Sequence, residues 1–346
     1  MIQNVMPGKH EEVTPDILIP YHITREELQD SSIAIIAVRP ETNKVTYESA
    51  IIKSIEPYAD VIYMASLSGI LLNDKAIVAC HYSSQLQFAI EGKEEMGKYP
   101  EMVKQFEEKF KVSFQEAKII GAFGAILEYK IKKNADELFE IMVPETDFLE
   151  MYGHTIKKIN GYYILNYDIP AVITRHHKNT AVFIIAVKLK DNRYRFCGIH
   201  HLIYENIRRD ERIRISDSEK RRHLPWYDQI RRTYHISRSH IEAMFDLTDY
   251  VFKDEKERIG YVDTPLGQLL LDKGIFTGEK LEERLAALKD NPLVYLNQEN
   301  GSLKLVNIIS EGKIRKASTF LEKDQDACAE IIKQINWEKS LSLQEE

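Results

Sequence analysis

The chain has 346 residues, 44% of them hydrophobic and 29% charged, with a formal net charge of −7. This composition is typical of globular proteins and excludes a globally disordered chain, and the length indicates two or three domains. The longest apolar runs have the length of strands, well below the roughly 20 residues of a membrane-spanning helix, and the polar N-terminus does not resemble a secretory signal. We therefore expect a cytoplasmic protein with no membrane segment.

The N-terminal part of the chain predicts an α/β unit. Residues 1–30 are polar and contain three prolines, so we expect an extended lead-in with a short helix near residues 24–30. The β-branched run Ile33–Val38 predicts a buried strand, residues 47–56 place three isoleucines on one helical face, and residues 61–64 predict a second strand. Together these segments form a β-α-β unit, for which a right-handed crossover is expected.

The segments that follow alternate between helical and strand-like patterns. Residues 76–80 form a strand-like apolar run, residues 84–111 have an interrupted helical pattern, and Asn134 is a suitable N-cap for a short helix. Residues 159–205 are β-rich in pattern and include a turn signal at Asn160-Gly161. The strands expected there cover residues 162–165, 171–174, 181–189 and 194–196.

The C-terminal part begins with a charged segment and ends with a compact unit. Residues 204–258 are charged, poor in glycine and helical in pattern, which predicts a connector. Two helices and two short strands around Asn300-Gly301 then follow in an order that resembles a winged helix. A last amphipathic helix is expected over residues 326–337. The other predicted elements of this unit cover residues 265–272, 279–288, 293–296 and 303–306.

These elements predict a protein of the α+β or α/β class, with an N-terminal mixed sheet flanked by helices. The mixed domain is either one unit or two subdomains, 31–150 and 151–203. The expected organisation is a lead-in at 1–30, a mixed α/β domain at 31–203, a charged helical connector at 204–258, and a winged-helix-like unit with a C-terminal helix at 259–340.

Several stretches of the N-terminal half are similar to nucleoside diphosphate kinases. Residues 33–41 resemble that family's first strand running into its Lys-Pro-Asp segment. Residues 121–128 followed by 135–142 are similar to its strand-then-helix step, and residues 153–157 to its Gly-Thr-Ile-Arg segment. The resemblance covers a minor part of the chain, and it implies an α/β fold that binds nucleotide phosphates.

The same resemblance implies where an anion would bind. Arg39 stands where the family has a lysine, and a guanidinium holds phosphate as a planar fork. The phospho-accepting histidine corresponds to His176 or His177, although the Gly-Ser that follows it in the family is absent. We predict an anion or nucleotide site at Arg39, Arg175, His176 and His177 without turnover. A phosphotransferase that uses His176 or His177 is an alternative.

Histidines and cysteines show no spacing typical of a metal site. The pairs His176-His177 and His200-His201 each follow a predicted strand, where adjacent residues point to opposite faces, so each pair offers at most one ring. The sequence has no His-x-x-x-His helix, and its three cysteines form no Cys-x-x-Cys pair. We therefore predict reduced thiols, no metal and no cofactor.

One basic segment lies within an otherwise acidic chain. Residues 193–240 contain 12 Lys/Arg and 6 Asp/Glu, a net +6, so the remainder of the −7 total is −13. Residues 227–241 are similar to a helix-turn-helix whose recognition helix begins at Arg238, which makes nucleic-acid binding an alternative function. The interleaved acidic residues favour a solvated helical face instead. The arginines that would contact nucleic acid are Arg208, Arg209, Arg212, Arg231, Arg232 and Arg238.

The C-terminal unit indicates a surface for a protein partner. Residues 266–274 resemble half of the cyclic-dinucleotide-binding module of type II secretion ATPases, but Pro265 replaces that module's arginine. Residues 260–346 contain 11 basic and 15 acidic side chains, a net −4, and an acidic winged helix suits a protein better than DNA. We predict a non-enzymatic regulatory or adaptor protein with a protein partner and a small anionic ligand.

Overall fold

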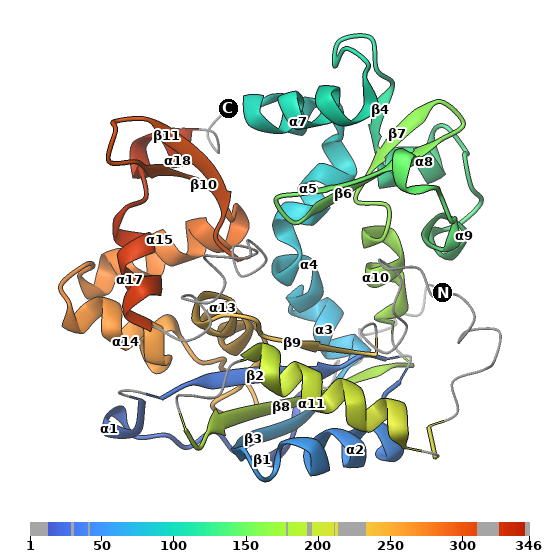
Figure 1. Cartoon of the computed structure of the whole chain (residues 1–346). Coiled ribbons are helices and arrows are strands. Elements are labelled where there is room, and N and C mark those ends of the chain that lie inside the picture. The colour runs from blue at the N-terminus through green and yellow to red at the C-terminus, as the bar shows by residue number, and fades with distance from the viewer. Residues whose placement is uncertain are drawn as a thin grey trace, which may run out of the picture.

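The computed structural model describes residues 13–28, 31–40, 42–177, 179–191, 196–210, 212–213, 233–309 and 325–342. Within these residues the chain is an α+β protein, as predicted, with three sheets and many helices. The largest sheet lies at the base of the view in Figure 1, and the other two stand above it on opposite sides. No helix of the described residues is long and apolar enough to cross a membrane.

The basal sheet is built from two β-α-β halves. Its strand order is β1-β3-β8-β2-β9, and every neighbouring pair is antiparallel. Since β2 and β3 both run antiparallel to β8, which lies between them, the predicted β-α-β unit is present in split form. The elements are β1 (Asp16–Ile19), β2 (Ile33–Val38), α2 (Val45–Ile55), β3 (Ala59–Ser68), β8 (Ala181–Leu189), α11 (Phe196–Arg209) and β9 (Tyr234–Ile236).

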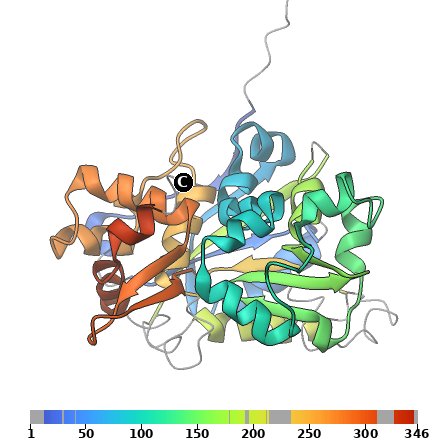
Figure 2. The same ribbon diagram turned by 90° about the horizontal axis from the view of Figure 1, so that it is seen from above.

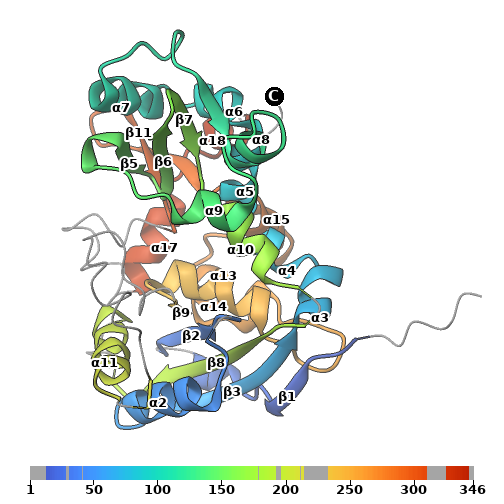
Figure 3. The ribbon, with the colours of Figure 1, turned by 90° about the vertical axis from the view of Figure 1, so that its right-hand side faces the viewer.

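Helices cover both faces of this sheet, because β2 and β8 carry apolar side chains on both sides. On one face, Ile36 of β2 packs with Ile51 of α2 and Ile203 of α11. On the other face, Ile35 packs with Leu247 of α13. Figure 3 shows α2 and α11 on the outer side of the sheet and α13 on its inner side. The helix α13 spans His240–Tyr250.

Residues 69–180 form an insertion between β3 and β8. Short helices lead from the basal sheet to a small mixed sheet with the order β4-β7-β6-β5. The helical elements are α3 (Gly69–Asp74), α4 (Ile77–His81), α5 (Ser83–Glu91), α6 (Lys93–Gly97), α7 (Pro100–Phe110), α8 (Ala122–Leu127), α9 (Ala135–Glu140), η1 (Glu145–Asp147) and α10 (Ile169–Arg175). The strands are β4 (Ile119–Gly121), β5 (Phe148–Met151), β6 (His154–Ile159) and β7 (Tyr162–Leu165).

Two strands predicted in this insertion are wrong. Residues 76–80 lie mostly in α4, and residues 171–174 lie in α10. A short apolar run fits a buried helix as well as a buried strand, so periodicity alone does not separate the two. In α10 the fixed φ of Pro170 favours the first helical turn, and this outweighs the β preference of the following Val172 and Ile173.

The local cap and turn signals of the insertion are confirmed. The Oδ1 atom of Asn134 accepts the backbone N–H of Glu137 at 2.8 Å, which makes Asn134 the N-cap of α9. Asn160 and Gly161 have φ angles of 52° and 81° and join β6 to β7 as a two-residue turn. Both residues tolerate positive φ, so this local chemistry was readable from the sequence.

The C-terminal unit has the predicted order of two helices, a hairpin and a further helix. Most of its buried leucines and isoleucines form one cluster, to which α13 contributes Ile241, Met244 and Phe245. The predicted helix at 326–337 is divided in two, because Ile335 bridges to Leu296 of the hairpin. The elements are η3 (Tyr261–Asp263), α14 (Pro265–Asp272), α15 (Gly278–Asp290), β10 (Leu293–Asn297), β11 (Leu303–Asn307), α17 (Gln325–Lys333) and α18 (Trp337–Ser342).

The predicted lead-in and connector both belong to the basal sheet region. Residues 16–19 of the lead-in form β1, which pairs with β3. The segment 204–258 is not a solvated connector in its described part, since β9 pairs with β2 and α13 is buried along its whole length. A helix is present where the recognition helix was predicted, but its proposed contact with DNA is wrong, because a helix that packs against three apolar clusters has no face free for DNA. Residues 214–232 lie outside the described residues.

The insertion and the C-terminal unit lie side by side above the basal sheet, as Figure 2 shows from above. They share an apolar cluster in which Tyr99 of the insertion packs with Leu293 and Tyr295 of β10. The Nδ2 atom of Asn291 donates to the Tyr99 hydroxyl at 2.6 Å. Helix α13 lies between these parts and the basal sheet.

Candidate functional site

Helix α13 carries three buried carboxylates on one face. Glu242, Asp246 and Asp249 are spaced i, i+4 and i+7, so they line one side of the helix. Their exposed fractions are 3%, 1% and 0%. An ionised carboxylate in the interior is costly unless it is paired and hydrogen-bonded, so the partners of these three side chains define the site.

Glu242 is ion-paired with Arg238, which lies just before the first residue of the same helix. The Arg238 Nη2 atom lies 2.9 Å from Glu242 Oε1, and the Arg238 backbone N–H donates to Oε2 at 2.7 Å. The Glu242 carboxylate raises the pKa of Arg238 above its ordinary value. The side chain of Ser239 accepts the backbone N–H of Glu242, which makes Ser239 the N-cap of α13. This pair fixes the start of α13.

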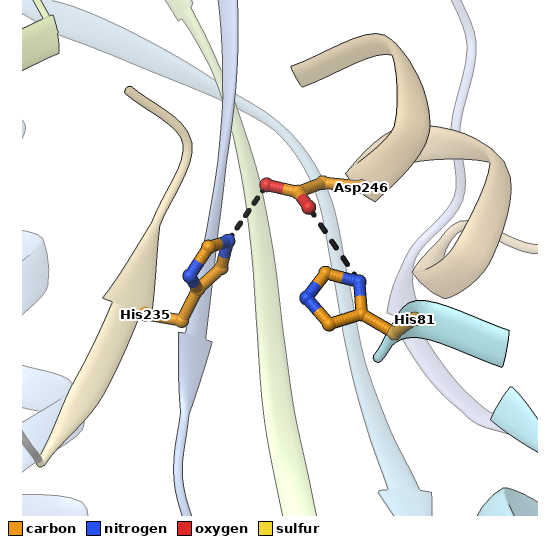
Figure 4. Close-up of side chains that lie close together, drawn as sticks. All are labelled: His81, His235 and Asp246. Atoms are coloured by element: carbon orange, nitrogen blue, oxygen red, sulfur yellow. Dashed lines mark hydrogen bonds and ion pairs between the residues drawn. The ribbon is translucent and has the colours of Figure 1, made fainter. Parts of the chain in front are cut away.

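Asp246 lies between two histidines, as Figure 4 shows. Its Oδ2 atom is 2.8 Å from His235 Nε2 and accepts the Ser237 hydroxyl at 2.7 Å, whereas its Oδ1 atom is 3.7 Å from His81 Nδ1. The Oδ1 atom is buried and accepts no hydrogen bond from the residues that the structure describes. Burial alone would raise the pKa of Asp246, but His235, with His81 and Ser237, holds that pKa below its ordinary value. The side chain is therefore an ionised carboxylate.

Asp249 joins the insertion to the C-terminal unit. Its Oδ2 atom lies 3.0 Å from His81 Nδ1, at the end of α4, and its Oδ1 atom is ion-paired with Lys289 of α15. The Arg258 Nη1 atom is 3.9 Å from the same Oδ1 atom. Burial lowers the pKa of His81, but Asp249 and Asp246 together raise it above the ordinary histidine value. Asp249 thus connects three segments that are remote in sequence.

His81, His235, Asp246 and Asp249 form one largely buried cluster of charged and histidine side chains. A cavity of about 200 Å³ opens beside this cluster. It lies where the basal sheet, the insertion and the C-terminal unit meet, which is a common position for a ligand site. A second cavity of about 30 Å³ shares Arg39, Tyr82 and His235 with it. The lining of the larger cavity includes Arg39, His81, Tyr82, Gln85, Thr155, Asn166, Asp168, His235, Arg238, Glu242, Asp246, Asp249 and Lys289.

The structure brings three of the four predicted anion-site residues together. Arg39, Arg175 and His176 all line the smaller cavity, and His177 is exposed outside it. The Arg175 guanidinium is paired with Asp136 at 2.9 Å and lies over the ring of Phe139. Arg39, at the end of β2, forms no ion pair with a carboxylate in the described part of the chain. Anion binding at these residues stays a prediction.

The arginines predicted for nucleic acid do not form one patch in the described residues. Arg208 and Arg209 pair with Glu205 on α11, and Arg212 pairs with Asp210. Arg238 is held by the buried Glu242. These pairs confirm that interleaved acidic residues neutralise the arginines that the structure describes. Arg231 and Arg232 lie outside the described residues.

The predicted histidine pairs differ from the histidines of the cluster. His200 and His201 lie in α11 and His176 follows α10, so the expectation that each pair follows a strand is wrong. Sequence reasoning missed His81 and His235 because no spacing relates residues so far apart. One signal was available, since acidic residues at i, i+4 and i+7 on a helix that is apolar on its other faces predict a buried, paired site.

Comparison of the chain with protein-family models, with curated proteins and with solved structures finds no match.

Proposed function

We propose that this protein binds a small anionic ligand in the central cavity, with Arg39 as its principal contact. Three cationic side chains line the cavity, and two of them are already paired, Arg238 with Glu242 and Lys289 with Asp249. Arg39 lines both cavities and has no carboxylate partner among the described residues. This guanidinium, which has no ion pair within the described part of the chain, is the observation that carries the proposal.

The chemistry of the lining supports a phosphate-bearing or carboxylate ligand. A guanidinium offers two parallel N–H donors to such a group, and the bond is strengthened where water is excluded. Burial raises the pKa of Tyr82, so its phenol stays protonated near the guanidinium. The volume of about 200 Å³ is below the range of about 300–1,000 Å³ that drug-sized ligands occupy. A small metabolite therefore fits the cavity better than a polymer.

The position of the cavity supports a regulatory function for such binding. A ligand there would contact the basal sheet through Arg39, the insertion through Tyr82 and the C-terminal unit through Lys289. Binding energy spent on all three parts would stabilise one arrangement of them relative to others. The acidic C-terminal unit would then present its surface to a protein partner in the ligand-bound arrangement. We place this activity in the cytoplasm on the basis of the composition.

A ligand screen with matched arginine variants tests the proposal. Thermal unfolding would be measured with inorganic phosphate, a nucleoside monophosphate and a dicarboxylate, because a ligand of the native state raises its stability. Arg39→Gln should weaken binding of the best anion roughly 10- to 100-fold, since hydrogen bonds to charged groups contribute about 1.5–3 kcal/mol. Arg39→Lys should bind with intermediate affinity, because it keeps the charge and loses the fork.

The control is Arg25→Gln. Arg25 is also an arginine of the basal sheet region, but its side chain is 65% exposed and paired with Asp272. This variant should bind the anion as the unmodified protein does. Equal affinity of Arg39→Gln and the unmodified protein, or no stabilisation by any of the three anions, would overturn the proposal.

A further inference from the structure

We propose that His81, His235 and Asp246 form a binding site for one divalent transition-metal ion, with Zn²⁺ as the first choice. One potential ligand atom from each side chain lies within 4.8 Å of the other two. Two imidazoles and a carboxylate are a donor set that Zn²⁺ and other first-row metals accept. Ligand atoms bonded to one Zn²⁺ lie roughly 3–4 Å apart, given bonds of about 2.0–2.2 Å, so small side-chain rotations close the site.

The second observation is a buried carboxylate oxygen, Asp246 Oδ1, that lies in ion-pair range of His81 but accepts no hydrogen bond from the described residues. Within the described ranges Asp246 Oδ1 accepts no hydrogen bond, although its side chain is only 1% exposed. Its 3.7 Å separation from His81 Nδ1 is too long for a hydrogen bond. A buried carboxylate oxygen that accepts no hydrogen bond lowers the stability of the folded state, so such an atom in a native protein calls for a specific explanation. A cation held between the carboxylate and the imidazoles satisfies this atom.

The surrounding residues fit the outer shell of a metal site. Asp249 contacts His81 Nδ1 at 3.0 Å, which leaves the other ring nitrogen, Nε2, as the ligand atom, and Figure 4 shows this nitrogen turned toward His235. Asp249 is itself fixed by the ion pair with Lys289. The Ser237 hydroxyl holds Asp246 from the opposite side. A carboxylate behind a histidine ligand orients the ring and raises its basicity.

The three ligand residues also line the larger cavity, so the ion would keep coordination positions open toward it. A site with three protein ligands and an open position binds water or a ligand there, in contrast to the closed four-ligand sites that only stabilise a fold. The metal site lies on the same cavity wall as Arg39, but it does not need an anion. Its occupancy is therefore a separate question from the function proposed above.

The test uses the full chain after treatment with a chelator and its removal. Calorimetric titration with Zn²⁺ should show one ion per chain, and Co²⁺ should give visible absorption bands of a nitrogen- and oxygen-coordinated ion. His81→Gln and His235→Gln should each abolish the bands and the tight binding. Asp249→Asn should weaken binding by about 10- to 100-fold, as expected for an outer-shell partner. Circular dichroism would establish that each variant is folded.

Two variants serve as controls. His177→Gln removes an exposed histidine outside the cluster and should leave Co²⁺ absorption unchanged. Arg39→Gln removes the proposed anion contact and should also leave metal binding unchanged, so failure of one proposal is distinguishable from failure of the other. Absence of binding at one ion per chain, or equal binding by folded His81→Gln and His235→Gln proteins, would overturn the metal site.

Discussion

Helices α11 and α13 both carry charged side chains at helical spacing, but they use them differently. On α11, Arg209 is paired with Glu205 at 3.1 Å, and their side chains are 78% and 24% exposed. On α13, Asp246 and Asp249 are almost completely buried and their partners come from α4, β9 and α15. The first helix neutralises its charges locally in water, whereas the second depends on the tertiary structure to neutralise them.

The apolar residues between the charges explain this difference. Helix α11 has one buried stripe, formed by residues such as Ile199 and Ile203, and its charges lie on the other side. Helix α13 has apolar side chains on several faces, because Ala243, Leu247 and Met244 each pack in a different cluster. A charge count is therefore uninformative about function unless it is read together with the hydrophobic pattern around it.

Removal of the Asp246 carboxylate is expected to have the largest effect. Asp246→Ala leaves His235 and Ser237 without their acceptor, and breaking a buried pair costs about 3–5 kcal/mol. The free energy of unfolding would be measured by urea denaturation in the presence of a chelator. Asp272→Ala, which removes an exposed partner of Arg25, is the matched control and should cost less than about 1 kcal/mol. Equal losses in the two variants would contradict the contrast between buried and exposed charges.

His154, a buried histidine outside the cluster, extends the comparison of buried and exposed groups to the pH dependence of stability. Burial lowers the pKa of His154 from 6.5 to about 3, and its ring is stacked on Phe88. Between these values the unfolded chain binds a proton that the folded protein does not. Stability that is present above pH 6.5 is therefore lost as the pH falls toward 3, by about 2 kcal/mol between pH 7 and pH 5.

The variant His154→Gln tests this linkage, because glutamine keeps an acceptor for Asn166 and has no proton to gain. The free energy of unfolding would be measured at both pH values. The unmodified protein should lose about 2 kcal/mol more than the variant on acidification. His177→Gln, at an exposed position, should lose as much free energy of unfolding on acidification as the unmodified protein does. If His154→Gln lost as much free energy of unfolding on acidification as the unmodified protein, the buried ring would not titrate as proposed.

Signals that act over a few residues were readable from the sequence. The apolar run of β2, the Asn134 cap and the Asn160-Gly161 turn each follow from side-chain and backbone chemistry within one turn or strand. The pairing of β1 with β3 and the burial of α13 could not be predicted from the sequence, since they depend on contacts with remote segments. Periodicity predicts which face of an element is apolar, but it does not predict what covers that face.

The candidate site shows the same limit more strongly. Arg39, Arg175 and His176 were found together through a family resemblance, and the structure places them around one small cavity. His81 is separated from its partner Asp249 by 168 positions, and no short motif encodes such a contact. The acidic stripe on α13 was the available local signal. This stripe predicts that the carboxylates have partners, because buried carboxylates need them, but it does not predict which residues those partners are.

The smallest expected effect concerns the exposed charges of α11. Glu205→Gln removes the partner of Arg208 and Arg209, and an exposed i,i+4 pair contributes about 0.3–0.5 kcal/mol. The loss should shrink further at high salt, because solvent ions screen exposed charges and leave buried ones largely unscreened. A double-mutant cycle with Arg209→Gln at two salt concentrations would measure the coupling. A coupling of several kcal/mol that persists in salt would mean that α11 is covered in the folded protein, and its arginines would then resemble those of α13.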